Sequence, residues 1–136
     1  MRLNGPIILR FLGLLLMLNG TFMAASAIAS AIFQDGSGPA LLVSGALTLI
    51  VGLAGYIFGS TRDKNISKRD GYLIVSLGWV VMALSGCLPF IISGEIPSFV
   101  DALFETMSGY TTTGATILED IEIVAPGILL WRSITH

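Results

Sequence analysis

Hydrophobic residues occur along this chain in three long runs that are separated by short polar stretches. The runs cover residues 6–33, 39–60 and 71–92, and each can supply the roughly 20 residues that a helix needs to cross a bilayer. Of the 136 residues, 54% are hydrophobic and 12% are charged, about half the charged share of soluble domains. The pattern predicts an all-α integral membrane protein with three transmembrane helices.

The first two runs are predicted to form a transmembrane helix hairpin within residues 1–60. The polar turn between them, residues 34–38, is short, and Pro39 suits the first turn of a second helix. The second run contains Gly55 and Gly59 in a GxxxG pattern. This pattern allows two helix backbones to approach closely, so it favours tight packing of the hairpin.

A cleavable signal peptide is the alternative for the first run. Arg2 precedes the run, and Ala29-Ser-Ala31 resembles a cleavage site. The run is longer than the apolar region of a signal peptide, and small residues such as Ala25 and Ser26 suit close helix packing. These two features favour a membrane helix.

Basic residues gather in residues 61–70, which follow the second run. This stretch holds four of the seven Lys and Arg residues of the chain, namely Arg62, Lys64, Lys68 and Arg69. Loops rich in Lys and Arg stay in the cytoplasm, so we expect a basic cytoplasmic loop here. Two crossings then place the N-terminus, with Arg2 and Arg10, on the cytoplasmic side as well.

A shorter segment, residues 99–110, is predicted to enter the membrane as a re-entrant half-helix. At about 1.5 Å per residue it reaches roughly 18 Å, which is about half of the hydrocarbon core. Ser98 with Asp101 three residues later resembles a capping box. Asp101 and Glu105 lie toward the positive end of this helix. They are candidates for electrostatic support of a bound cation.

The half-helix is predicted to end at the sequence GYTTTGAT, residues 109–116. Consecutive β-branched threonines are mediocre helix formers, and Gly114 adopts backbone angles that other residues avoid. We therefore expect extended backbone here, whose carbonyl groups could replace the water around a cation. An extracellular amphipathic helix followed by a Thr-rich turn is the alternative, and residue spacing alone does not decide between the two.

Residues 101–116, DALFETMSGYTTTGAT, and residues 131–136, WRSITH, resemble the first pore repeat of the TrkH-type potassium uptake proteins, in the Trk/Ktr/HKT superfamily. The resemblance implies four non-identical repeats around one pore. An additional N-terminal helix pair precedes the first repeat, so the resemblance covers the whole chain. It assigns the first repeat to residues 71–136, with an outer helix at 71–92, a pore helix at 99–110, a filter at 111–116 and a truncated inner helix at 126–136.

The resemblance also places a selectivity filter of backbone carbonyl groups on Thr111, Thr112, Thr113, Gly114 and Ala115, with K⁺ held at Thr112 and Thr113. Thr116 stands where potassium channels have a second filter glycine, so a shorter or less ordered filter is expected. The expected function is permeation of K⁺, and Na⁺ is the second candidate ion. The alternative is a non-conducting membrane scaffold. An enzyme is not expected, because the sequence shows no cluster of nucleophile, base and orienting group.

The final helix is short and three pore repeats are missing, so an N-terminal fragment of a longer transporter is expected. The implied partners are the remaining repeats of the same protein, a second copy in a homodimer, membrane lipid and a cytosolic nucleotide-binding regulator of the TrkA type. No nucleic acid and no cofactor is expected, and K⁺ is the transported ion. The implied location is the bacterial inner membrane.

Three other residues carry smaller expectations. Arg132 is expected to extend to the interface or to pair with an acidic residue of the preceding loop, namely Glu119, Asp120 or Glu122. Glu105 either attracts cations or pairs with a neighbouring repeat. Cys87, the single cysteine, is expected to be a small core residue.

Overall fold

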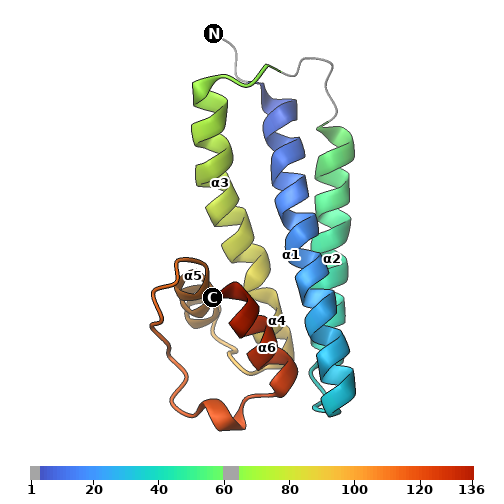
Figure 1. Ribbon diagram of the computed structural model, residues 1–136, viewed down its shortest axis with the longest axis vertical. Helices are drawn as coiled ribbons and strands as arrows, with labels where there is room; N and C mark the ends of the chain where they lie inside the picture. Colours follow the sequence, from blue (N-terminus) through green and yellow to red (C-terminus); the bar gives the residue numbers. More distant parts are fainter. Residues whose placement is uncertain (1–3, 60–64) are drawn as a thin grey trace.

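A computed structural model describes residues 4–59 and 65–136, and the regular structure in these ranges is entirely helical. The elements in chain order are α1 (Gly5–Phe33), α2 (Gly38–Phe58), α3 (Lys68–Gly86), α4 (Leu88–Ser93), α5 (Phe99–Tyr110), the 3₁₀ turn η1 (Ile121–Ile123) and α6 (Pro126–Thr135). Three segments are long and apolar enough to cross a membrane: α1, α2 and the combined run of α3 and α4 (Figure 1). The predicted fold class, an all-α membrane protein with three such helices, is confirmed.

Helices α1 and α2 pack together through glycines, as the GxxxG pattern predicted. A Cβ atom added to Gly13 would lie 2.5 Å from the carbonyl oxygen of Gly52, and one added to Gly59 would lie 2.4 Å from the amide nitrogen of Arg10. Gly55 faces the Cα atom of Gly13 in the same way, at 3.4 Å. The two backbones are therefore in direct contact, which only residues without side chains allow.

Helix α3 begins at Lys68, before the predicted start at Gly71. Ser67 is the N-cap, and its hydroxyl accepts the N–H of Asp70 while the Asp70 carboxylate accepts the N–H of Ser67. This capping box starts the helix three residues before the predicted start, within the basic stretch. Residues 60–64, which include Arg62 and Lys64 of that basic stretch and the predicted end of the second run, lie outside the described residues.

The predicted outer helix is also interrupted. It is divided at Cys87 into α3 and α4, because Pro89 has no N–H to continue the hydrogen bonding of the helix. The carbonyl group of Gly86 lies at this break and accepts the indole N–H of Trp131 at 3.1 Å. The break thus provides an attachment point for α6.

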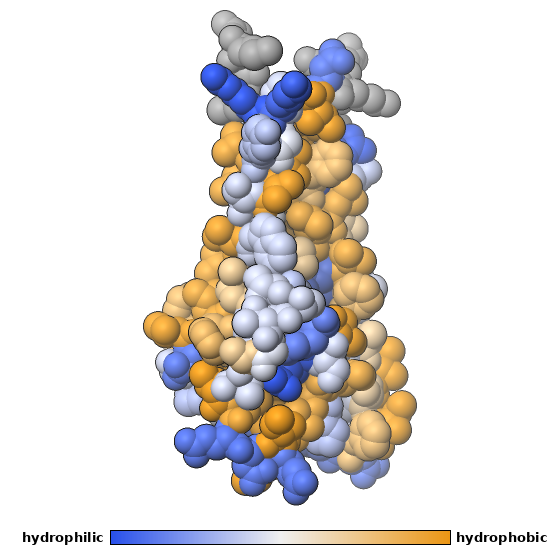
Figure 2. All heavy atoms as spheres, turned by 60° about the vertical axis from the view of Figure 1, so that its left-hand side comes forward, coloured by the Kyte–Doolittle hydropathy of each residue, from blue (hydrophilic) through white to orange (hydrophobic). Residues whose placement is uncertain are grey.

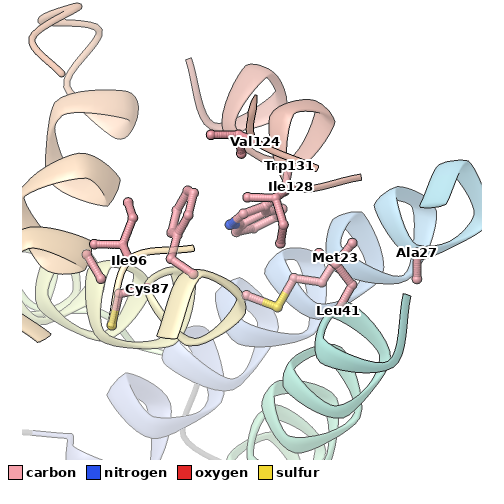
Figure 3. Close-up of a cluster of buried hydrophobic side chains, with 10 residues drawn as sticks. Met23, Ala27, Leu41, Cys87, Ile96, Val124, Ile128 and Trp131 are labelled. Atoms are coloured by element: carbon pink, nitrogen blue, oxygen red, sulfur yellow. The ribbon is translucent and has the colours of Figure 1, made fainter. Parts of the chain in front are cut away.

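A hydrophobic cluster joins the helix hairpin to α4, α5 and α6 (Figure 3). Trp131 is completely buried at its centre, and Cys87 is 1% exposed, which confirms its predicted core position. The buried members are Met23, Ala27, Leu41, Cys87, Phe90, Ile96, Ala102, Val124, Ile128 and Trp131. The cluster holds the short helices at the end of the bundle far from the N-terminus (Figure 1). On the face that Figure 2 shows, hydrophobic side chains flank a central stripe of intermediate and hydrophilic residues, and hydrophilic residues gather at both ends.

Candidate functional site

Helix α5, from Phe99 to Tyr110, leads into the loop in which the sequence predicts a filter. Ser98 caps its start by accepting the N–H of Asp101, whose side chain is exposed in the first turn. The other end of α5 lies tightly against α6, because a Cβ atom on Gly109 would lie 2.7 Å from the hydroxyl of Thr135. The loop therefore starts from a helix that is held in place at its C-terminal end.

The threonine run closes α5 with a C-terminal cap. The N–H of Thr112 donates to the carbonyl of Gly109 at 2.8 Å, and the N–H of Thr113 donates to the carbonyl of Ser108 at 3.0 Å. These two bonds form the Schellman pattern, in which the residue at the position of Thr112 adopts a left-handed conformation. Thr112 has a φ of 53° accordingly.

This geometry corrects the expectation of extended backbone from Thr111 onward. Thr111 has φ −85° and ψ 1°, and the positive φ of Thr112 is a rare conformation for a β-branched residue. Gly114 also has a positive φ, 75°, as its predicted conformational role requires. The turn could not be predicted from the local sequence, because a left-handed backbone conformation is expected of glycine and not of threonine.

Backbone carbonyl groups of the loop are available for a ligand. The N–H groups of residues 111–113 all donate back to carbonyl groups of α5. Within the part of the chain that the structure describes, the carbonyl groups of residues 111–114 accept no hydrogen bond, and these four residues are exposed. The carbonyl group of Ala115 differs, because it accepts the hydroxyl of Ser108 at 2.5 Å.

Glu105 holds the far side of this loop. Its side chain is completely buried and accepts the hydroxyl of Thr116 at 3.0 Å and the N–H of Ile117 at 3.1 Å. The same carboxylate forms an ion pair with Arg132 of α6. One acidic residue of α5 thus fixes the end of the loop and the neighbouring helix together.

The partner of Arg132 differs from the sequence prediction. Arg132 pairs with Glu105, and not with an acidic residue of the preceding loop, because α6 packs back against α5. The loop acids, Glu119, Asp120 and Glu122, are exposed. A signal did exist in the sequence: two opposite charges within apolar segments need each other when both are removed from water.

Two carboxylates from distant segments hold the start of α6. Asp35, in the turn between α1 and α2, accepts the N–H of Gly127 at 2.5 Å, and Glu95 accepts the N–H of Ala125 at 3.3 Å. Asp35 also accepts hydrogen bonds from Ser30 and Ser37. Partial burial raises the pKa of Asp35, but these hydrogen bonds outweigh it and lower the pKa to about 2. The sequence places Asp35 in a polar turn and gives no sign of this contact with α6.

These features define a class of protein: an all-helical membrane protein in which a short helix and an exposed loop are held beside the spanning helices. Comparison with known proteins shows which proteins the chain is similar to. The sequence is 40% identical over 126 residues to the Trk system potassium uptake protein TrkH of Halomonas elongata, and 36% identical over 127 residues to TrkH of Escherichia coli strain K12. In both cases 92% of this chain aligns with 26% of the relative.

A solved structure supports the same relationship. The crystal structure of the potassium transporter TrkH from Vibrio parahaemolyticus matches 96% of this chain and 28% of that chain, with a TM-score of 0.88 and 34% identity. No protein-family model matches the sequence. The chain is therefore a homologue of the TrkH proteins over nearly all of its length, and the predicted resemblance is confirmed.

The matched region is only a part of these relatives. The chain spans about a quarter of the length of the TrkH proteins that it resembles. The relatives are transport proteins and not enzymes, in agreement with the prediction from the sequence.

Proposed function

We propose that this chain supplies the first of four pore repeats of a potassium uptake protein, with α5 as a re-entrant pore helix and residues 111–116 as its part of the selectivity filter. The observation that carries the proposal is the row of exposed carbonyl groups at residues 111–114, which accept no hydrogen bond from the described residues. They follow the C-terminal, partially negative end of α5. Such an arrangement suits a cation that exchanges its water for carbonyl oxygen atoms.

The surrounding contacts support a role in which the loop must keep its shape. The Schellman turn fixes the loop at Thr112 and Thr113, and Glu105 fixes it at Thr116 and Ile117. K⁺ would be coordinated by carbonyl oxygen atoms at Thr112 and Thr113. In this arrangement Glu105 acts through its hydrogen bonds, because Arg132 balances its charge.

The length of α5 supports a re-entrant position. Its 12 residues reach roughly 18 Å, too little to cross a hydrocarbon core of roughly 30 Å. Exposed loop backbone at membrane depth must face protein or a water-filled cavity. In this proposal the remaining repeats of the same protein supply that cover. By the similarity to the TrkH proteins, we also propose an inner-membrane location, a cytoplasmic N-terminus, a homodimer and a TrkA-type regulator.

Substitution of Gly114 tests the filter in the full-length transporter. Gly114 has a φ of 75° and nothing within 4 Å of an added Cβ atom, so Gly114→Ser changes the backbone conformation without a clash. Gly36, in the turn between α1 and α2, has a φ of 80° and equally open space, which makes Gly36→Ser a matched control. We expect Gly114→Ser to lower the ratio of rubidium to sodium uptake and to impair growth at low K⁺, while Gly36→Ser leaves both unchanged.

The alternative function, a non-conducting membrane scaffold, predicts a different result. Cation uptake and selectivity would then be the same for the wild type, Gly114→Ser and Gly36→Ser at equal amounts of protein in the membrane. That result would overturn the filter assignment.

A further inference from the structure

A hydrogen bond links the helix hairpin to the residue with which α5 ends. The hydroxyl of Tyr110 donates to the side-chain oxygen of Asn19 in α1 at 2.6 Å, and Asn19 is only 2% exposed. We propose that Asn19 is a positioning residue for the filter loop, acting through Tyr110. This inference rests on the proposed function, because it concerns the same loop.

The hydrogen bonds around Asn19 permit one orientation of its amide group. The hydroxyl of Ser85 in α3 donates to the carbonyl of Met82 at 3.1 Å, so its oxygen is left to accept the amide N–H of Asn19 at 2.8 Å. The amide oxygen must then face Tyr110, whose hydroxyl is the donor. The hydrogen bonds therefore all run in one direction. Tyr110 donates to Asn19, Asn19 donates to Ser85, and Ser85 donates to the backbone of α3.

A glycine on α3 makes room for this contact. A Cβ atom on Gly86 would lie 2.8 Å from the hydroxyl oxygen of Tyr110 and 2.7 Å from a methyl carbon of Thr106. Because Gly86, next to Ser85, has no side chain, the side chain of Tyr110 can approach α3 closely at this position. Gly86 provides space for the Tyr110 side chain, and the amide of Asn19 provides its hydrogen-bond acceptor. These two features are independent of each other.

Tyr110 is held by packing against Gly86 and by its hydrogen bond to Asn19, and it also borders two pockets. The residue lines a pocket of about 380 Å³ between α1 and α3 and a second one of about 80 Å³ that Asn19 also lines. The hydrogen bond to Asn19 adds a directional contact to the packing of this ring, in a membrane-spanning helix where an unpaired amide is costly.

The consequence for the loop follows from its position in the chain. Tyr110 immediately precedes Thr111 and Thr112, whose conformations form the Schellman turn and present the first carbonyl groups. A displaced Tyr110 would move these oxygen atoms relative to Thr116 and Ile117, which Glu105 holds at the other end of the loop. The N-terminal hairpin would then be part of the support of the filter as well as a membrane anchor.

The test compares Asn19→Leu, Tyr110→Phe and the double variant in the full-length transporter. The ratio of rubidium to sodium uptake is measured at equal amounts of protein in the membrane. We expect each single variant to lower the ratio by up to about tenfold, the factor that corresponds to one hydrogen bond of ordinary strength. The double variant should be no worse than the more affected single variant, because both remove the same bond. Tyr110→Phe removes a single oxygen atom, so it still tests the proposal when the Asn19→Leu variant does not fold.

Two controls remove comparable groups away from the loop. Tyr56→Phe removes a hydroxyl that accepts a hydrogen bond from Arg10, and Ser26→Ala removes a buried hydroxyl that donates to the carbonyl of Phe22 within α1. Both should leave the ratio unchanged. A purely structural role of Asn19 would lower the uptake of both ions equally, and this result would overturn the inference.

The outcome also separates this inference from the proposed function. If Gly114→Ser changes selectivity while Asn19→Leu and Tyr110→Phe do not, the positioning role is overturned and the filter assignment stands. If none of the three changes selectivity, both are overturned.

Discussion

Arg132 and Glu105 form an ion pair that connects α6 to α5, with the Arg132 side chain 17% exposed and that of Glu105 completely buried. The carboxylate also binds the backbone beyond the filter loop, at the N–H of Ile117. Both charges are thus removed from most of the water around them. Such a pair is costly to break, because the remaining partner keeps its desolvation penalty without compensation.

Glu105→Gln should therefore destabilise the protein by about 3–5 kcal/mol, since it leaves the Arg132 charge without its partner. The measurement is the free energy of unfolding of the full-length protein in detergent. Glu122→Gln is the control, because Glu122 is exposed and its loss should change stability by no more than about 0.5 kcal/mol. Equal stability of the two variants would contradict the role of the pair.

Close contact of α1 and α2 predicts opposite effects for two alanine substitutions. Gly13→Ala places a methyl group 2.5 Å from backbone atoms of α2 and should destabilise the hairpin by about 1–3 kcal/mol. Gly71→Ala, in α3, meets nothing within 4 Å and should stabilise by up to about 1 kcal/mol, because alanine is the better helix former. Thermal unfolding of both variants distinguishes packing from helix propensity, and a gain in stability for Gly13→Ala would contradict direct backbone contact.

Thr112 and Gln34 are the non-glycine residues with a positive φ in residues 4–59 and 65–136, at 53° and 52°. Glycine at either position should relieve a backbone strain of about 1 kcal/mol. In the filter proposal, only Thr112→Gly should also lower the ratio of rubidium to sodium uptake, because it loosens the loop. An unchanged ratio for Thr112→Gly, with Gln34→Gly as the reference, would argue against a rigid filter at this residue.

The lowered pKa of Asp35 should make the free energy of unfolding depend on pH in the acid range. Hydrogen bonds lower its pKa from 3.8 to about 2, so the folded state is favoured by the ionised form. This contribution is complete above the unfolded pKa and is lost as the pH falls through the folded one. Asp35→Asn should therefore reduce the loss of stability between pH values near 3.8 and 2. Asp101→Asn, at an exposed residue, is the control, and an equal effect of both would contradict the assignment.

Much of the fold could be predicted because its signals are local. The three spans follow from the length of the apolar runs, and the start of α5 follows from the cap at Ser98. Two helix boundaries that differ from the prediction also have local causes, since the capping box of Ser67 and Asp70 and the break before Pro89 are both visible in the sequence. They were missed because hydrophobicity locates a membrane span but does not define where its backbone hydrogen bonds begin and end.

Sequence patterns were enough to predict the class of protein, the close packing of the hairpin and the position of the threonine loop. The pairing of polar groups became visible once the helices were packed together: Glu105 with Arg132, Asp35 with Gly127, and Tyr110 with Asn19. The reason is physical. Periodicity and capping describe which face and which end of a helix a residue occupies, whereas a buried polar group finds its partner only when distant helices have packed together.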